Sequence, residues 1–532
     1  MADNRKNILI VGGGAAGMSC ANQLAQHPDR FKVTIIERMN VCGGQATSIS
    51  LDKEKYGTTW MNDGVQGGSG IFKHTFHYFE QYGHKPQPIR LQIAFGQGET
   101  FWTNCFPSQL VDKHSKDIKK FGKVLKLIKW FMPILGLVPV RMMLKIFMFN
   151  KDFGDQMVYP LIALFLGTGN QTANVASAIL ERLFDDPNMK LWDYSPETLL
   201  PNLPLMYTFP KLHDFYADWA EDLKSKGVDI RLETDVVEVK SRSKEGVVIT
   251  YRHVRKEVHD DPSEVRGKEV LVADAKVIEE SFDEMVLCIL ADDAKRLLGK
   301  TATWKENFVL GGAMFYDDIT VTHSDSKYFS EHFETHLKEE LIAEPKSEDE
   351  KKQIAFSRGE AEGPDGETPG YRPMYYTRSY KEDPKLIEMA FDVSNYQHQF
   401  RMDHNAPKCP MPHDKHVFQS IFLNKEQEHL WSRGAIDPDK IILEKWWHQL
   451  GHRWQHYVRV VPGMMFLNGH NSTWFGGSWT LVNMHEMACV SGIAVAYRLG
   501  AKYEHFDDFA EDLLKKYLLL SHGVLYKRGK NA

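Results

Sequence analysis

The sequence contains no paired cysteines and no segment typical of secretion. Its six cysteines are scattered and none belongs to a CxxC pair, so neither a disulfide framework nor a zinc site is indicated. They are Cys20, Cys42, Cys105, Cys288, Cys409 and Cys489. A reducing compartment is the simplest interpretation. The first residues, MADNRKN, lack the apolar core of a secretory signal, so we expect a cytoplasmic protein.

Long hydrophobic runs and an excess of positive charge are also missing. No uninterrupted apolar run reaches the roughly 18–20 residues of a membrane-spanning helix. The net charge of -6 argues against nucleic acid as the main partner. With 42% hydrophobic and 26% charged residues, the composition is that of a folded protein. At 532 residues, the chain is long enough for two or three domains.

A glycine-rich turn stands near the start of the chain, inside a predicted βαβ unit. Residues 8–11 and 33–36 have the continuous apolar character of buried strands. Residues 15–24 are small and apolar, which indicates a buried helix between them. The glycines that join the first strand to this helix are spaced as G-x-G-x-x-G, the spacing of dinucleotide-binding proteins.

Each glycine of this motif has a predicted role. Gly12 permits the tight turn, Gly14 lets the backbone approach a pyrophosphate, and Gly17 lets the helix pack on the strand. The phosphates would then lie at the helix N-terminus, where free N–H groups favour negative charge. Glu37, which ends the second strand, can accept hydrogen bonds from a ribose, and its charge disfavours NADP. The alternative is a glycine turn that binds no ligand.

A second glycine-rich segment near the C-terminus decides between FAD and NAD. Residues 472–501, STWFGGSWTLVNMHEMACVSGIAVAYRLGA, indicate a strand, a glycine turn and a helix that begins at about His485. A cofactor as long as FAD needs a second anchor remote from the first. A helix N-terminus there can face the flavin and stabilise negative charge on the reduced ring.

The order of these motifs, GxGxxG, then E…GG, then GSWT…HE…SGxAVA, resembles the FAD-dependent amine oxidoreductase and phytoene desaturase superfamily. Within it, the sequence is most similar to a poorly characterised branch of NAD/FAD-binding flavoproteins. The internal stretches WMNDGVQGGSG, FDEMVLCILADDAKRLLG and DITVTHSDSKYF resemble segments of that branch. The resemblance implies an α/β fold with a discontinuous Rossmann-like FAD-binding domain of the glutathione-reductase and amine-oxidase type. It also implies a mixed α+β substrate domain and a helical cap.

The resemblance implies noncovalent FAD, because no cysteine lies where some members attach the flavin. The cofactor contacts that it implies are Gly12, Gly14, Ala15, Ala16, Gly17, Glu37, Arg38, Gly44, Gln45, Asp63, Gly64, Val65, Val236, Gly477, Ser478, His485, Glu486 and Met487. Two positions depart from the family pattern: Gln45 stands where amine oxidases usually have arginine, and Ser478 stands where many have aspartate. These departures weaken an amine oxidase assignment more than they weaken the FAD assignment.

The two cofactor anchors lie at opposite ends of the chain, so the predicted FAD-binding domain is discontinuous. It comprises residues 1–110, 205–300 and 460–510. The remaining predicted parts are a helical cap at 111–204, the strands of a substrate domain at 301–459, and a C-terminal tail at 511–532. A polar stretch near 342–373, rich in glycine and proline, is predicted to be an exposed, mobile insert.

Residues 116–151 combine a basic amphipathic helix with an apolar stretch that Pro133 and Pro139 interrupt. Such a segment suits peripheral contact with a membrane surface, or the mouth of a lipid tunnel. The alternative is a pair of cap helices that pack on the core and expose their lysines to solvent. The segment favours a long, apolar substrate, with a carboxylate as one option.

Candidate acid and base residues are few. His485 and Glu486 could tune the flavin charge or act as an acid/base pair, although helix capping would explain them equally well. His323 and Asp325 are weaker candidates. Three histidines, His448, His452 and His456, have the spacing of one helical face, as in a metal site, but the flanking tryptophans favour a packed or surface segment. We therefore predict no metal.

Three functions remain open. The first is an FAD-dependent oxidoreductase that dehydrogenates or isomerises a lipophilic, unsaturated substrate, a fatty acid or polyene, by hydride transfer to flavin N5. The single dinucleotide motif and the basic apolar segment favour it. The second is a flavin amine oxidase that produces hydrogen peroxide, and the third is a non-catalytic FAD-binding protein. The sequence does not indicate an oligomeric state.

Overall fold

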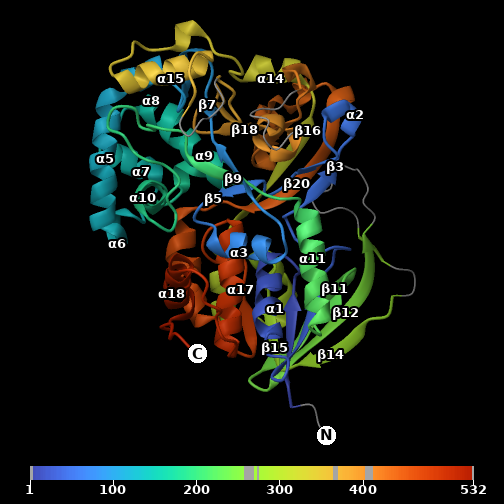
Figure 1. Ribbon diagram of the computed structural model, residues 1–532. Coiled ribbons are helices and arrows are strands. Elements are labelled where there is room, and N and C mark those ends of the chain that lie inside the picture. The colour runs from blue at the N-terminus through green and yellow to red at the C-terminus, as the bar shows by residue number, and fades with distance from the viewer. Residues whose placement is uncertain (1–3, 257–268, 272–274, 364–369, 402–410, 530–532) are drawn as a thin grey trace.

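The computed structural model describes residues 4–256, 269–271, 275–363, 370–401 and 411–529. Figure 1 shows two halves. The half that contains the N-terminus also contains the last two helices, so segments from both ends of the chain lie side by side there. The other half contains a large sheet and the cap helices. The predicted α/β architecture with a second, mixed domain is confirmed.

The first half is built on a parallel sheet whose strands come from distant parts of the sequence. In this sheet, the described residues form five strands in the order β10-β2-β1-β15-β21. Their bounds are β1 Lys6–Val11, β2 Phe31–Ile36, β10 Asp229–Arg231, β15 Glu284–Leu287 and β21 Thr473–Phe475. Helices cover this sheet, which is why its strands are almost continuously apolar. This half of the molecule is therefore built from segments that are far apart in the sequence.

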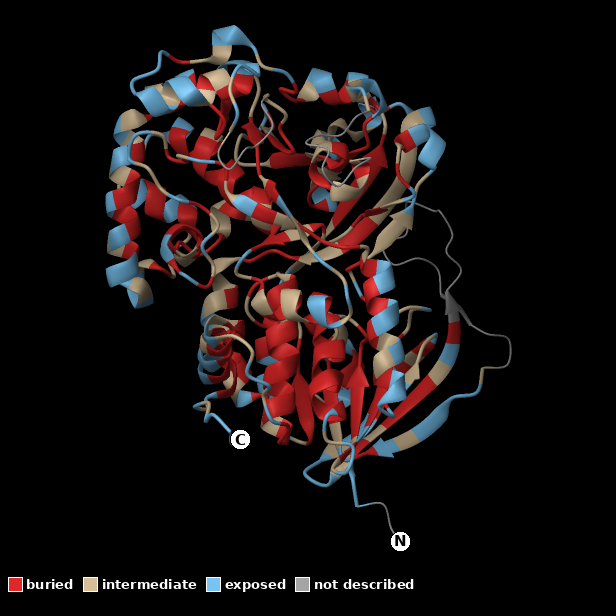
Figure 2. Cartoon of the chain, in the orientation of Figure 1, coloured by how far each residue is buried: buried red, intermediate tan, exposed pale blue. Residues whose placement is uncertain are grey.

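Two helices pack together on this sheet, α1 (Ala15–Ala25) and α17 (His485–Leu499). Both are buried along nearly their whole length, as Figure 2 shows. Glycine allows the close approach between them, since a Cβ atom at Gly492 would lie 2.0 Å from the backbone oxygen of Ala16. The start of the chain and its C-terminal glycine segment thus meet in one core.

A curved antiparallel ribbon flanks the parallel sheet. Its strands are β11 Thr234–Ser243, β12 Gly246–Lys256, β13 Glu269–Leu271 and β14 Ile278–Phe282. Arg242 on β11 forms a two-point ion pair with Glu306 on α13 (Trp304–Leu310), with both nitrogen–oxygen distances 2.8 Å. The two side chains are almost completely buried. This pair fixes the ribbon to the helices that follow β15.

The second half is built on a mixed sheet with the strand order β20-β16-β19-β18-β17-β7-β8 in the described part of the chain. The bounds are β7 Ile93–Phe95, β8 Trp102–Thr103, β16 Phe315–His323, β17 Tyr375–Ser379, β18 Ile387–Asp392, β19 Phe418–Phe422 and β20 Ile441–Leu450. The strands β7 and β8 lie within the first 110 residues, yet β7 pairs in parallel with β17. They therefore join the large sheet of the second half, although the sequence predicts that residues 1–110 belong to the FAD-binding domain.

Smaller strands connect the two halves. β5 (Gly67–Ser69) and β6 (Gln87–Arg90) both pair with β9 (Leu205–Thr208), and β3 (Ser48–Ser50) pairs with β4 (Trp60–Asn62). The segment from β4 to β5 thereby runs along the boundary between the two halves.

The cap is helical, as predicted. Its helices are α5 Ser115–Trp130, α6 Met132–Leu135, α7 Val140–Ile146, α8 Lys151–Phe153, α9 Tyr159–Leu166 and α10 Ala178–Asp185. The apolar face of α5, which includes Phe121, Val124, Leu125 and Ile128, is buried, while most of its lysines are exposed. In the described residues no helix combines the length and the apolar character that a bilayer crossing requires.

One local interpretation is wrong, and two predicted segments contain a helix. The three histidines do not share a helical face: His448 lies on strand β20, His452 lies in a left-handed turn, and His456 begins a π-helical turn. The expected insert near 342–373 contains helix α15 (Glu348–Arg358), whose Ile354 and Phe356 side chains are buried in one cluster with residues of the large sheet. The expected C-terminal tail is mostly α18 (Asp508–His522), a helix packed on α17. Residues 364–369 of the insert and Cys409 lie outside the described residues.

Candidate cofactor and substrate site

The glycine motif forms a tight turn between β1 and α1. Gly12 has φ +104°, and a Cβ atom there would lie 2.5 Å from the backbone oxygen of Cys288. Gly14 is the N-cap residue of α1, and no side chain caps this end of the helix. The first N–H groups of α1 therefore donate no hydrogen bond to a capping side chain and are available to a ligand. A bridge joins Gly14 to Gly43, and a Cβ atom at Gly14 would meet only Gly44 within 4 Å. The turn and the glycine pair thus form a side-chain-free cradle at a helix N-terminus.

A first cavity lies beside this cradle, at the carboxyl ends of β1 and β2, and is called here the strand-end cavity. Its walls are Val11, Gly12, Ile36, Glu37, Arg38, Thr234, Asp235, Val236, Ile289, Asp293, Arg296 and Leu297. The structure therefore brings Gly12, Glu37, Arg38 and Val236 together, although Val236 is about 200 residues distant in sequence. Ligands of open α/β sheets bind at this edge.

The Glu37 carboxylate is held by backbone groups. Its Oε2 accepts a hydrogen bond from the Gly13 N–H at 2.7 Å, and its Oε1 accepts one from the Met39 N–H at 2.8 Å. Burial raises the pKa of this carboxyl, although the two N–H groups act in the opposite direction. Each oxygen keeps a second lone pair that a ribose hydroxyl could use.

The central cavity lies between the two halves. It is bordered by the segment from Asp63 to Ser69, the N-terminus of α17, the cap and the large sheet. Its walls are Gln45, Asp63, Gly64, Val65, Gln66, Gly67, Gly68, Ser69, Phe72, Leu164, Phe165, Leu166, Gly167, Ile179, Leu183, Met189, Leu191, Met206, Thr320, Tyr375, Met389, Phe391, Gln419, Ile421, Leu423, Trp447, Gln449, Asn483, Met484 and His485. Five residues predicted to contact the cofactor, Gln45, Asp63, Gly64, Val65 and His485, thus lie around one space.

Side chains on or near the large sheet fix the position of the loop that contains Asn62 and Asp63 and borders this cavity. Gln397 donates a hydrogen bond to the Asn62 carbonyl at 2.8 Å and accepts one from its N–H at 2.9 Å. Gln419 donates to the Asp63 carbonyl at 3.2 Å. Lys445 lies 2.8 Å from the Asp63 carboxylate, and its charge neutralises this acidic side chain. The loop position is therefore set by residues more than 300 positions further along the chain.

His485 and Glu486 have separate partners. His485 lines the cavity, and its ring nitrogens lie 2.7 Å from the Tyr216 hydroxyl and 3.0 Å from the Thr75 hydroxyl. Burial lowers the pKa of His485 to about 4, so its imidazole is neutral at pH 7. Glu486 instead pairs with His74 at 2.7 Å. Its carboxylate also accepts hydrogen bonds from the N–H groups of His74 and Thr75 at the start of α3 (Lys73–Gln81).

This arrangement separates the two candidate catalytic residues. Burial alone would raise the pKa of Glu486, but the charge of His74 and the hydrogen bonds from His74 and Thr75 hold it below its ordinary value. Glu486 is absent from the described cavity walls and caps a neighbouring helix. An acid/base role is predicted for both residues and stays a prediction. Of the two, His485 is the one that lines the central cavity.

The other predicted residues surround the cavities. Gly477, with φ +135°, donates its N–H to the Ser491 hydroxyl, and Ser478 donates its hydroxyl to Asn483 at 2.9 Å. These contacts shape the turn before α17. The described walls of both cavities include none of Gly14, Ala15, Ala16, Gly17, Gly44, Gly477, Ser478 and Met487. Their contact with a cofactor stays a prediction.

The remaining histidine candidates have structural partners. His448 lies between Asp317 and Asp292, at 2.6 and 2.9 Å. Burial would lower the pKa of His448, but hydrogen bonds to these carboxylates raise it. His323 is the buried last residue of β16, with its Nε2 3.0 Å from the Ser420 hydroxyl, and Asp325 caps α14 (Ser326–His332). Within the described residues, no group of three or more histidine, cysteine or acidic side chains could hold a metal ion.

Most of the cavity wall carries no motif that sequence reasoning could use. The segment from Leu164 to Gly167, where α9 ends in a left-handed glycine, lines the cavity. Gln419 and Trp447 lie on different strands of the large sheet, and both come to line the cavity only when the sheet has formed. The available signal is the apolar face of each helix and strand, which predicts burial but not a ligand.

Comparisons with known proteins agree with this architecture. The model of a family described as an NAD(P)-binding Rossmann-like domain matches residues 10–85. No curated protein matches the sequence. Among solved structures, the chain is similar to a CLA-producing fatty acid isomerase from P. acnes, with 12% identity, a TM-score of 0.55, and coverage of 92% of this chain and 98% of that one.

Two amine oxidases show the same likeness. Putrescine oxidase bound to putrescine has 12% identity and a TM-score of 0.55, with 93% of this chain and 99% of that chain covered. Cyclohexylamine oxidase from Brevibacterium oxydans IH-35A has 10% identity and a TM-score of 0.55, with the same coverage. At these identities the likeness concerns the fold. The protein has the fold of the FAD-dependent amine oxidoreductases, as the sequence predicts.

Proposed function

We propose that this protein is an FAD-dependent oxidoreductase that acts on a lipophilic, unsaturated substrate such as a fatty acid or polyene. The reaction would be a dehydrogenation or a double-bond isomerisation. The observation that supports it is the central cavity, where an apolar wall of cap residues faces a glycine-rich loop and the N-terminus of α17. Such a space suits an extended hydrocarbon better than a small polar molecule.

The residues present fit noncovalent FAD. The strand-end cavity can hold the adenosine, with Glu37 as acceptor for the ribose hydroxyls. The cradle at Gly14 and Gly44 leaves room for a pyrophosphate beside uncapped N–H groups. The loop at Gly64 and the start of α17 border the space that remains for the ring. When bound, FAD supplies a hydride acceptor, which no protein side chain can replace.

The cavity wall has no net charge, which favours an uncharged group inside the cavity. Among its described lining residues there is no lysine or arginine, and the one acidic side chain, Asp63, is neutralised by Lys445. A charged group left in this space without a partner would be strongly unfavourable. The part of the substrate inside the cavity is therefore apolar, and a polar head group would stay at its mouth.

A flavin amine oxidase is the second candidate. Two similar solved structures are amine oxidases. The aromatic rings of Tyr375, Phe391 and Trp447 line the cavity, and such rings could flank an uncharged amine. Against it stand the extent of the apolar cap wall and the departures at Gln45 and Ser478.

One experiment separates these candidates. The purified protein, with its flavin spectrum recorded, is mixed without oxygen with a panel of unsaturated lipids and then with a panel of amines. We expect lipids to reduce the flavin absorbance, or to generate diene absorbance if the reaction is an isomerisation. Bleaching by amines alone, followed by hydrogen peroxide when oxygen returns, would show the amine oxidase instead. A folded protein that stays colourless with excess FAD would contradict both.

A further inference from the structure

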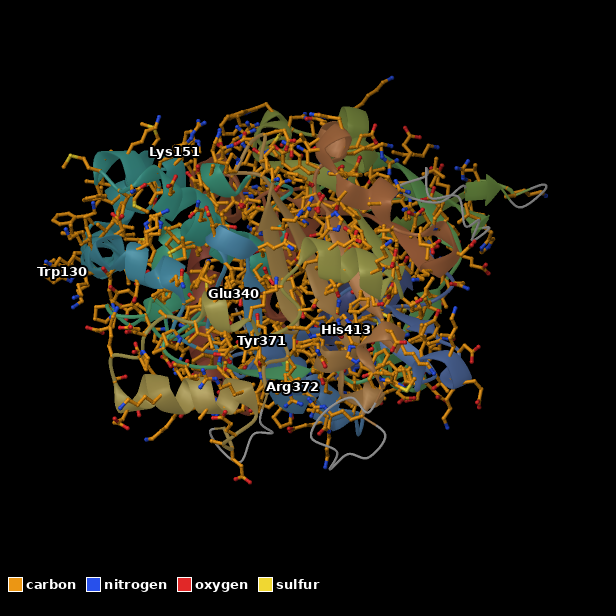
Figure 3. All side chains as sticks on the ribbon, turned by 90° about the horizontal axis from the view of Figure 1, so that it is seen from above. Trp130, Lys151, Glu340, Tyr371, Arg372 and His413 are labelled. Carbon is orange, nitrogen blue, oxygen red and sulfur yellow. The ribbon has the colours of Figure 1, made fainter. Side chains whose placement is uncertain are left out.

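The cap carries large apolar side chains that point into solvent. Trp130 is 76% exposed, Ile134 71% and Met148 82%. Phe131, Met142 and Ile146 are exposed as well, and all six residues lie on or directly after α5, α6 and α7. Together they are called here the outer cap face. Trp130 projects from the edge of the molecule, as Figure 3 shows. An exposed apolar patch of this kind marks an interaction site.

Positive charge surrounds the same face. Between residues 116 and 151 there are nine lysine or arginine residues and a single acidic one, Asp117, in a chain with a net charge of -6. Lys119, Lys123 and Lys126 are exposed at intervals of four and three residues, so they form a stripe along α5. Lys129 at the end of the helix pairs with Asp185. The stripe therefore adds a basic border to an apolar face.

We propose that the outer cap face docks on the surface of an anionic lipid bilayer. Apolar side chains would enter the boundary between headgroups and acyl chains, while the lysines contact lipid phosphates and carboxylates. Tryptophan is favoured at that depth, because its ring is apolar with one polar edge. A second copy of the chain suits the face poorly, because a two-fold contact would set one lysine stripe against another.

This surface belongs to the module that forms one wall of the central cavity. The buried face of α5 packs on α10, where Phe121 lies 5.9 Å from Phe184 between ring centroids. The neighbouring Leu183, with Ile179, lines the cavity. A docked cap would thus hold the cavity wall next to the bilayer. Membrane docking does not depend on the proposed reaction, and it is tested without a substrate.

The test is sedimentation of the full-length protein with phosphatidylcholine vesicles, with and without phosphatidylserine. We expect binding to the mixed vesicles at about 0.1 M salt, and loss of most of it at about 1 M, where the screening length falls from about 10 Å to about 3 Å. Replacing both Lys123→Gln and Lys126→Gln should weaken binding about tenfold to thirtyfold. The double change Trp130→Ser and Ile134→Ser should weaken it at least about tenfold.

Matched controls lie on α13. Trp304 is 74% exposed, close to the value for Trp130, and Lys305 beside it is exposed too. Trp304→Ser and Lys305→Gln should leave vesicle binding unchanged. Flavin content and melting temperature show that each variant is folded. The proposal is overturned if the wild-type protein ignores the mixed vesicles, if the controls weaken binding as much as the cap variants, or if the cap variants abolish a dimer and leave vesicle binding intact.

Discussion

Substituting Gly17→Ala tests whether the N-terminus of α1 holds the cofactor. A Cβ atom at Gly17 would lie 1.9 Å from the backbone oxygen of Gly12, and such atoms essentially never approach closer than 3.0 Å. The turn and the helix must therefore separate by about 1 Å. The opposite side of α1 offers no room, because Gly492 of α17 lies against Ala16. The first turn of the helix would move relative to the cradle.

The expected cost has two parts. Overpacking of this kind destabilises a protein by about 1–3 kcal/mol. A displacement of about 1 Å also breaks at least one hydrogen bond from the helix to a phosphate, and bonds to charged groups contribute about 1.5–3 kcal/mol. We therefore expect FAD affinity to fall about tenfold to a hundredfold. Titration of FAD-free protein with FAD, followed by flavin fluorescence, measures this change.

Gly434→Ala is the matched control, because no atom lies within 4 Å of the added Cβ and the position is exposed. It should change neither FAD affinity nor melting temperature. If Gly17→Ala binds FAD as tightly as the wild-type protein, the N-terminus of α1 does not hold the pyrophosphate. The proposed function would then lose its cofactor site.

Three further predictions concern stability and the cavity. Glu306→Gln leaves Arg242 buried without its counter-charge, so the free energy of unfolding at pH 7 should fall by about 3–5 kcal/mol in a denaturant titration. His448→Gln should lower the melting temperature more at pH 6 than at pH 9. The pKa of His448 is raised in the folded protein, so its protonated ring stabilises the fold. This stabilisation is complete below a pH of about 6.5 and is lost as the pH rises through the higher pKa of the folded state. Leu183→Trp should abolish the spectral response to lipids at unchanged flavin content, whereas Leu127→Trp on α5, outside the cavity, should keep it; an equal response from both would contradict the proposed cavity.

The nucleotide-binding core could be predicted from the sequence because its signals are local. The turn from Gly12 to Gly17 requires glycine for steric reasons that hold in any protein, and the buried residues of the strands on either side are almost all apolar. The basic face and the buried face of α5 also follow from helical periodicity. These features depend on neighbours within a few residues, so the sequence records them directly.

Long-range pairing explains what the sequence did not predict. β7 is only three residues long and is placed by its parallel pairing with β17, about 280 residues away. The His448 to His456 spacing suggested a helix, but residues 441–450 pair with β16 as a strand, and tertiary pairing overrides the local period. The C-terminal tail expected at 511–532 is mostly helix α18, which is placed by its packing on α17.

The same reasoning applies to the candidate site. Asp63 and Gly64 belong to the first segment, 1–110, of the predicted FAD-binding domain, but Gln419 and Lys445 from the large sheet determine where they lie. A cofactor on one side of this loop and a substrate on the other would therefore both contact the same backbone segment, which these hydrogen bonds hold in place. The loop is held by the uncharged side chains of glutamines and by the ion pair between Lys445 and Asp63, in which the two charges cancel. These contacts therefore leave no net charge in the cavity. An apolar substrate could then approach the ring without displacing a charged group, which is the physical reason for proposing a lipid substrate.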